Sequence, residues 1–254
     1  LSEEVILDHV MERLVVMEAS VHRGLKADLP SMQLLKPSAG RVFQAEAEGR
    51  VAAGGLHTRA AARAMAVMHV NGAMGVVCAA PTAGSAGVVP ATVVTMMEEW
   101  GLDRRQAALA LLAAGAIGVV VGTRATFAAE VAGCQVEIGA AGAMAAAAVV
   151  QVAGGSAQQV ADAAAIVLQN TMGSVCDMVQ GIVEIPCHTR NAAAASSAFV
   201  CADLVLGGYV NPIPLDETVD AVYATGRMLP RELKCTALGG LAATPSARAM
   251  PRLR

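Results

Sequence analysis

Two stretches of the sequence carry no charged side chain, and they limit the available folds most strongly. They run from Gln106 to Thr123 and from Ile138 to Ala161. Each reaches the length of about 18 residues at which a transmembrane helix becomes a candidate. Both are rich in Ala and Gly, which gain little from transfer into lipid, and neither is flanked by an aromatic belt or a lysine-rich loop. We therefore expect buried helices of a protein that does not enter the membrane.

Apolar residues recur at helical spacing through most of the chain, and strand signals are scarce. The expected helices, with capping residues where one is present, run from Ser2 to Gly24, Thr58 to Gly72, Pro90 to Trp100, Asp103 to Gly122, 124 to 133, 140 to 153, 156 (Ser156 cap) to 171, 190 to 207, and 216 (Asp216 cap) to 228. Residues 25–55 are expected to form loops with at most one or two short helices. "GIVEIP" at 181–186 reads as an extended connector because it ends in a proline. The sequence predicts one all-α domain over residues 1–254.

Composition excludes one broad class of function. Charged residues are 15% of the chain, the net charge is −3 and aromatic residues are 2%. Nucleic-acid binding needs clustered Lys and Arg and usually aromatic faces, so we do not expect it. No signal-peptide pattern opens the sequence, although a removed leader stays open, and we expect a cytoplasmic protein.

Six cysteines are expected to be free thiols, because the chain has ample core material and no export signal. Three of them lie at expected turns or helix boundaries, where a thiolate can point inward and neighbouring glycines let backbone amides approach the sulfur. These are Cys134, Cys176 and Cys187. Cys201 is expected in the core of a helix, whereas the sequence leaves the roles of Cys78 and Cys235 open.

The segment "APTAGSAGVVP" at 80–90 is a turn of small residues leading into a helix. Backbone N–H groups and the hydroxyls of Thr82 and Ser85 can bind an anion there, and a carboxylate suits the turn better than a nucleotide. An ordinary tight turn is an equally good interpretation from the residues alone.

Four motifs together resemble the α subunit or α domain of the iron–sulfur-dependent L-serine dehydratases. They are "VNGAMGVVCAAPTAGSAGVVPA" (70–91), "AEVAGCQVEIGAAGAMAAAA" (129–148), "CDMVQGIVEIPCHTRNA" (176–192) and "LKCTALGGLAATPSA" (233–247). The resemblance spans roughly residues 65–247, and residues 1–64 resemble the family only weakly.

The resemblance implies a [4Fe-4S] cluster held by Cys134, Cys176 and Cys187, whose fourth iron acts as a Lewis acid on the leaving hydroxyl of L-serine. The net products are pyruvate and ammonia, because the water that is eliminated is taken up again when the imine is hydrolysed. For the substrate we expect contacts from Thr82, Gly84, Ser85, Gly87, Asn71, Arg190 and Asn191, with the Gly239/Gly240 turn nearby. His188, His69 and Lys36 are the chemical candidates for the proton-abstracting base. A separate β subunit is also implied.

Two departures from the family pattern leave alternatives open. "CDMVQG" places Met178 and Gln180 where relatives have a proline and a small residue, and nothing in 25–55 matches a glycine-rich segment of the relatives. The alternatives are a lyase acting on another β-substituted amino acid or a hydroxy acid, a cluster-binding subunit without catalysis, and a small membrane protein.

Overall fold

The computed structural model describes residues 2–26, 28–30 and 32–253, and these residues form helices joined by turns. The α-helices are α1 (Glu3–Leu25), α2 (Ala39–Ala47), α3 (Gly55–Gly72), α4 (Val88–Trp100), α5 (Arg104–Arg124), α6 (Ala129–Ala132), α7 (Ile138–Val152), α8 (Ala157–Thr171), α9 (Cys187–Leu206), α10 (Leu215–Met228) and α11 (Pro245–Ala249). Short 3₁₀ helices are η1 (Ala83–Ser85), η2 (Cys134–Val136), η3 (Val179–Gly181), η4 (Arg231–Leu233) and η5 (Gly240–Ala243). The described residues contain no β-sheet, and the prediction of a single all-α domain is confirmed.

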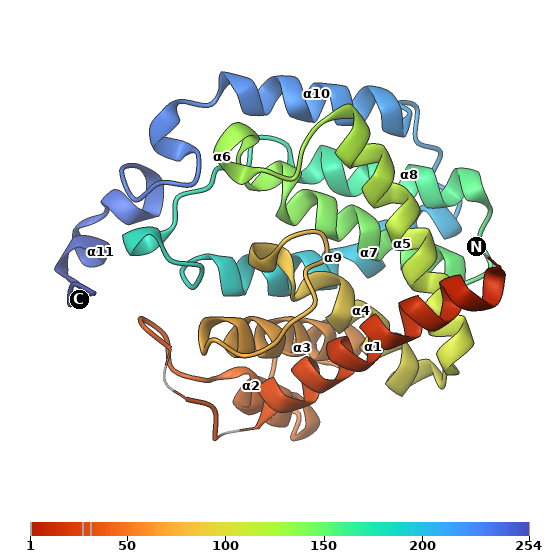
Figure 1. The fold of residues 1–254 in the computed structure, drawn as a ribbon, viewed down its shortest axis with the longest axis horizontal. Helices are drawn as coiled ribbons and strands as arrows, with labels where there is room; N and C mark the ends of the chain where they lie inside the picture. The colour runs from red at the N-terminus through yellow and green to blue at the C-terminus, as the bar shows by residue number, and fades with distance from the viewer. Residues whose placement is uncertain (1, 27, 31, 254) are drawn as a thin grey trace.

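Helix α7 is the centre of the fold, with α4, α5, α8 and α9 packed around it. Figure 1 shows α7 and α9 crossing the middle of the molecule, α10 along the top of the view and α1 across the lower part. Every residue from 138 to 150 is buried, so α7 has no solvent face until Gln151 in its last turn. Small side chains make this possible, because a Cβ on Gly142 would lie only 2.8 Å from Val167 of α8.

Local capping places several helix starts as the sequence predicts. The Ser2 hydroxyl accepts from the Val5 amide at 3.4 Å, and Asp103 and Ser156 each form a capping box with the glutamine three residues later. "GIVEIP" is a connector without strand pairing, although residues 182–186 lie in bends and turns and not in an extended stretch. Among the described residues between α1 and α3, only α2 is a regular helix. The predictions of a connector and of loops with at most one or two short helices are confirmed.

Other helix starts lie elsewhere than predicted. Helix α3 begins at Gly55 and not at Thr58, because the carboxylate of Glu46 in α2 accepts the Gly55 amide at 2.9 Å and caps the helix from outside. Helix α9 begins at Cys187 and α4 at Val88, each before the predicted residue. Asp216 lies in the first turn of α10, where Pro214 occupies the N-cap position.

The predicted helix over 124–133 is wrong, because Arg124 belongs to α5 and only Ala129–Ala132 is helical among the residues after it. Helix α5 continues through Arg124, and the Thr126 hydroxyl then accepts the Ala128 amide at 3.1 Å. A side chain that bonds the backbone locally in this way competes with helix formation.

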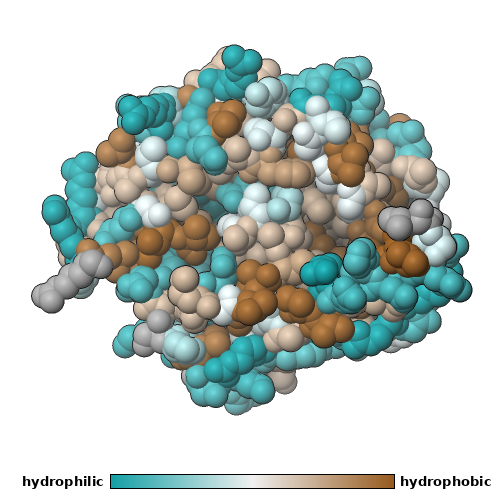
Figure 2. Space-filling view, in the orientation of Figure 1, coloured by the Kyte–Doolittle hydropathy of each residue, from teal (hydrophilic) through white to brown (hydrophobic). Residues whose placement is uncertain are grey.

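Two helical segments are long and apolar enough to cross a membrane by length and composition alone. They are Arg104–Arg124, which is 39% buried, and Cys134–Val152, which is 83% buried. Core helices of this composition meet the same criteria. On the face in Figure 2, apolar residues form separate groups with polar residues between them. That the chain stays outside the membrane remains a prediction.

Candidate functional site

The three cysteines of the sequence analysis stand at breaks in the helical structure. Cys134 opens η2 directly after Gly133, whose φ of +77° turns the chain; Cys176 lies in the connection after α8; and Cys187 is the first residue of α9. All three are buried. Cys201 lies in the buried interior of α9. The predicted positions of these four cysteines, three at turns or helix boundaries and one inside a helix, are confirmed. That three of them bind a metal cluster stays a prediction.

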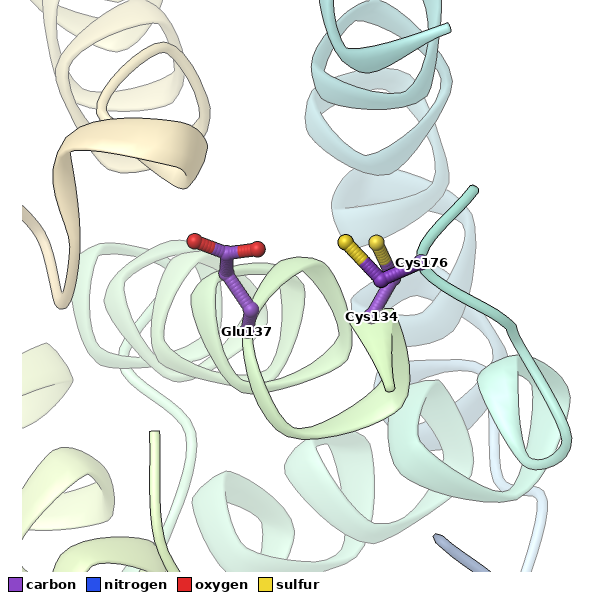
Figure 3. A group of neighbouring side chains, drawn as sticks. All are labelled: Cys134, Glu137 and Cys176. Carbon is purple, nitrogen blue, oxygen red and sulfur yellow. The ribbon is translucent and has the colours of Figure 1, made fainter. Parts of the chain in front are cut away.

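Cys134 and Cys176 come together with Glu137. Their ligand atoms, two sulfurs and one carboxylate oxygen, all lie within 4.8 Å of one another. Figure 3 shows the two sulfurs side by side, with the Glu137 carboxylate pointing to the same side from the start of α7. Two soft sulfur donors and one carboxylate oxygen form a group able to hold a metal.

The thiols influence one another's protonation. The closeness of the Cys134 and Cys176 thiols lowers the pKa of Cys134 and raises that of Cys176, so Cys134 is the one of the two that ionises first. Burial, and then the negative charges of Cys134 and Glu137, raise the pKa of Cys187 to about 12. Cys187 therefore shares the electrostatic environment of the other two thiols.

Arg190 brings positive charge to this group. One guanidinium nitrogen donates to the Cys134 sulfur at 3.5 Å and to the Val175 carbonyl at 2.8 Å, and the other donates to Asp177 at 2.9 Å. The buried Asp177 also accepts the Leu241 amide at 2.7 Å. A Cβ at Gly240 would collide with Asp177, so the Gly239/Gly240 turn lies against this ion pair. Asp177 thus fixes the guanidinium that faces sulfur.

A cleft of about 230 Å³ reaches Cys134 and Arg190 from the side of α7, α8 and α9. Apart from Ile138, its other lining residues are small or polar, namely Gly139, Asn170, Thr171, Ser174, Ala193, Ala194 and Ser197. A small polar molecule has room to approach the sulfur there.

The turn at 82–87 is tied to the thiol group from two sides. The Thr82 hydroxyl donates to Glu137 at 2.5 Å, and a Cβ at Gly84 would collide with that carboxylate. The Asn191 side chain of α9 donates to the Gly84 carbonyl at 2.9 Å and accepts the Gly87 amide at 3.0 Å.

Further hydrogen bonds hold the same turn in place. Asn71 of α3 donates to the Ala83 carbonyl at 2.9 Å, and the hydroxyls of Thr82 and Ser85 bond each other at 3.0 Å. The structure thereby brings Thr82, Gly84, Ser85, Gly87, Asn71 and Asn191 together at one turn beside Glu137, while Arg190 contacts the Cys134 sulfur. Burial raises the pKa of Glu137, against the Thr82 hydrogen bond that lowers it.

His69 and His188 form a buried pair whose ring nitrogens, both Nδ1, lie 3.0 Å apart. Nε2 of His69 faces the amides of Ser38 at 3.0 Å and Ala39 at 3.2 Å, so it accepts and the proton of the neutral ring sits on Nδ1. His188 then accepts at Nδ1 and carries its own proton on Nε2. That Nε2 makes no hydrogen bond of good geometry within the described residues, although the Val183 carbonyl is close enough to favour protonation.

Burial is the main cause that lowers the pKa of each ring to about 4, with the His69 ring adding to the effect on His188. Both histidines are therefore neutral at neutral pH. His188, although it follows Cys187 in sequence, is directed at His69.

Lys36 is exposed, unlike the buried histidine pair. It follows a segment held by Glu184, whose carboxylate accepts the amides of Gln33, Leu34 and Leu35 at 2.7 to 2.8 Å. The Glu184 carboxylate thus connects residues 33–35, which lie before α2, to the connector that precedes Cys187.

Three acidic residues with a place in this region, Glu137, Asp177 and Glu184, were not singled out from the sequence. A signal exists, since each lies within a cysteine motif of a chain that is only 15% charged. An acidic residue in such a setting is often paired with a specific partner.

We predict that Asp177→Ala lowers the free energy of unfolding by about 3 kcal/mol, because it leaves the charge of Arg190 partly buried without its partner. The side chains of Asp177 and Arg190 are 4% and 26% exposed. Asp220→Ala breaks the ion pair with Arg124 at the surface, where the side chains are 53% and 39% exposed, and should cost less than about 1 kcal/mol. Urea unfolding of the iron-free chain measures both. Equal losses in the two variants would contradict the prediction.

The pKa of His69 predicts a pH dependence of stability. The unfolded chain gains a proton at His69 near its ordinary pKa of 6.5, whereas the folded chain resists protonation down to about 4. Stability should therefore fall as the pH drops from about 6.5 to 4, with His69 contributing on the order of 3 kcal/mol, and should show no His69 effect above that range.

Urea unfolding as a function of pH measures this slope. His69→Gln should make the slope shallower, with His188, whose pKa is also lowered to about 4, accounting for what remains. His9→Gln, a change at an exposed histidine of α1, should leave the slope unaltered. Coincident slopes for the wild type and His69→Gln would refute the assignment.

Comparison with known proteins identifies the family. The sequence profile described as "Serine dehydratase alpha chain" matches residues 2–242. A probable L-serine dehydratase alpha chain of Bacillus subtilis is 43% identical over 99% of this chain and 84% of its own length. A probable L-serine dehydratase alpha chain of Latilactobacillus sakei is 45% identical over 74% of this chain and 90% of its own length. An L-serine dehydratase alpha chain of Peptoniphilus asaccharolyticus is 38% identical over 97% of this chain and 84% of its own length. The chain belongs to the serine dehydratase alpha chain family.

Proposed function

We propose that this chain is the catalytic α subunit of an iron–sulfur-dependent L-serine dehydratase, which converts L-serine into pyruvate and ammonia. The family membership and the names of the relatives support the reaction. The observation that carries the cofactor is the convergence of buried Cys134 and Cys176 thiols beside Glu137 and the charged Arg190.

The donor set suits a [4Fe-4S] cluster held by Cys134, Cys176 and Cys187. Thiolates are the usual protein ligands of such clusters, and the guanidinium of Arg190 offsets part of the negative charge that they bring into a buried site. When bound, a cluster with three thiolate ligands supplies an iron with an open position, which acts as a Lewis acid on the hydroxyl that leaves.

The turn at 82–87 is the proposed site for the substrate carboxylate. The amides of Ala83 and Gly84 have no hydrogen-bond partner among the described residues, and both residues reach the surface of the turn. Two free N–H groups on adjacent residues are suited to a carboxylate. The side chains of Asn71 and Asn191 donate hydrogen bonds to the carbonyls of Ala83 and Gly84. These bonds fix the orientation of the turn before substrate binds.

Glu137 is the best placed proton acceptor for the Cα–H bond. Burial raises its pKa toward the working pH, which strengthens a carboxylate as a base, and its oxygen is already beside Thr82 of the substrate turn. His188, His69 and Lys36 were the candidates from the sequence. In the tautomer set by the amides of Ser38 and Ala39, His188 presents an N–H, which fits a hydrogen-bond donor better than a base.

The overall chemistry needs one proton removed from Cα and one hydroxide removed from Cβ. The resulting enamine tautomerises to an imine, and water then releases ammonia and leaves the 2-oxo acid. No pyridoxal phosphate is required for these steps, in keeping with a chain that has only three lysines: Lys26, Lys36 and Lys234.

We further propose that the chain works in the cytoplasm with a separate β subunit. The designation "alpha chain" in the names of the relatives supports the second subunit.

A cysteine-to-alanine series tests the function. Cys187→Ala, purified without oxygen together with its β subunit, should lose both iron and L-serine turnover, because two thiolates do not retain the cluster. Cys201→Ala is the matched control, since Cys201 is a buried thiol of the same helix α9 and should retain both. Iron analysis and pyruvate formation are the measurements. Full iron content in Cys187→Ala would refute the ligand assignment.

A further inference from the structure

A fourth thiol, that of Cys235, lies beside the proposed ligand Cys176. The two segments pair through their backbones: the Cys176 amide donates to the Leu233 carbonyl at 2.8 Å, and the Cys235 amide donates to the Cys176 carbonyl at 2.8 Å. The Cys176 and Cys235 side chains are also close enough for each thiol to shift the pKa of the other. The backbone pairing therefore holds these two cysteines together across a sequence separation that spans α9 and α10.

The backbone at Cys235 has an unusual conformation. Its φ is +59°, in the left-handed region that glycine and asparagine adopt far more readily than cysteine. A residue held there against its preference needs compensating contacts, which the pairing with Cys176 provides.

The two thiols differ in access. Cys235 is half-buried and can be reached from solvent, whereas Cys176 is buried. A solvent-borne oxidant thus meets Cys235 first, with Cys176 in position to resolve the product.

We propose that Cys176 and Cys235 form a disulfide when the cluster is absent, with a low-molecular-weight disulfide such as oxidised glutathione as the oxidant. The Cys235 thiolate attacks one sulfur of the oxidant, which releases one thiol and leaves a mixed disulfide. The Cys176 thiolate then attacks the Cys235 sulfur and releases the second thiol. One oxidant molecule is reduced to two thiols, and the protein loses two hydrogens as it gains one S–S bond.

This inference rests on the proposed function in one respect. Cys176 binds iron when the cluster is present and bonds to Cys235 when it is absent. Oxidation would protect Cys176 from irreversible oxidation beyond the disulfide while iron is missing. Reduction would return the thiol to the site.

The test uses the full chain, freed of iron by a chelator without oxygen and then exposed to oxidised glutathione. After the remaining thiols are alkylated, a protease that cleaves after glutamate separates the relevant cysteines. Cys134 falls in fragment 131–137, Cys176 in 138–184, Cys187 and Cys201 in 185–217, and Cys235 in 233–254. Mass spectrometry without reduction identifies the joined fragments.

We expect fragments 138–184 and 233–254 to be joined in the wild type. The link should be lost in Cys235→Ser and retained in Cys78→Ser, where the altered cysteine is also half-buried. A link between 131–137 and 138–184 in its place would overturn the proposal, and so would a fragment 233–254 that carries only glutathione.

Iron content, measured on the same chain before chelation, tests the cluster separately. With iron bound the 138–184 to 233–254 link should be absent, and Cys235→Ser should retain its iron. If the link forms while all iron is retained, the disulfide stands and the assignment of Cys176 as a ligand fails.

Discussion

The contact between the Arg190 guanidinium and the Cys134 sulfur is the interaction on which the proposed site depends. Buried thiolates and a buried carboxylate are costly unless positive charge lies close by. Arg190 supplies this charge, and Asp177 and the Val175 carbonyl fix its orientation. The same residue joins the first turn of α9 to the connection after α8, so charge compensation and the relative placement of two cysteine segments are achieved together.

The small-residue packing around α7 is the second requirement. Residues 138–150 of α7 are buried against α4, α5, α8 and α9, so the turns at its N-terminal end are attached to a packed helix. Cys134 and Glu137 lie at that end, next to the substrate turn at 82–87. A site built on such fixed elements keeps its donor atoms in place in the absence of a ligand.

Local sequence signals predicted the features that local contacts decide. The starts of α1, α5 and α8 follow their own capping residues, Ser2, Asp103 and Ser156, and were found from the sequence. The start of α3 was missed because Glu46 caps it from another helix. The helix predicted over 124–133 was wrong because Thr126 bonds the backbone in place of the next helical turn.

In the candidate site, too, some residues could be identified from the sequence and others depend on contacts between distant segments. The resemblance identified the cysteines, the turn at 82–87, Arg190 and Asn191, which the fold brings to one region. The roles of Glu137 and Asp177 depend on partners 55 and 13 residues away in the chain, Thr82 and Arg190. The tautomer of His188 depends likewise on amides that touch only His69. Spacing within a motif carries no information of this kind.

Iron and acid-labile sulfide in the wild-type chain, purified with its β subunit under strict exclusion of oxygen, test the central claim most directly. The account predicts about four of each per chain, together with pyruvate formation from L-serine. Preparations that turn over L-serine without iron would contradict it.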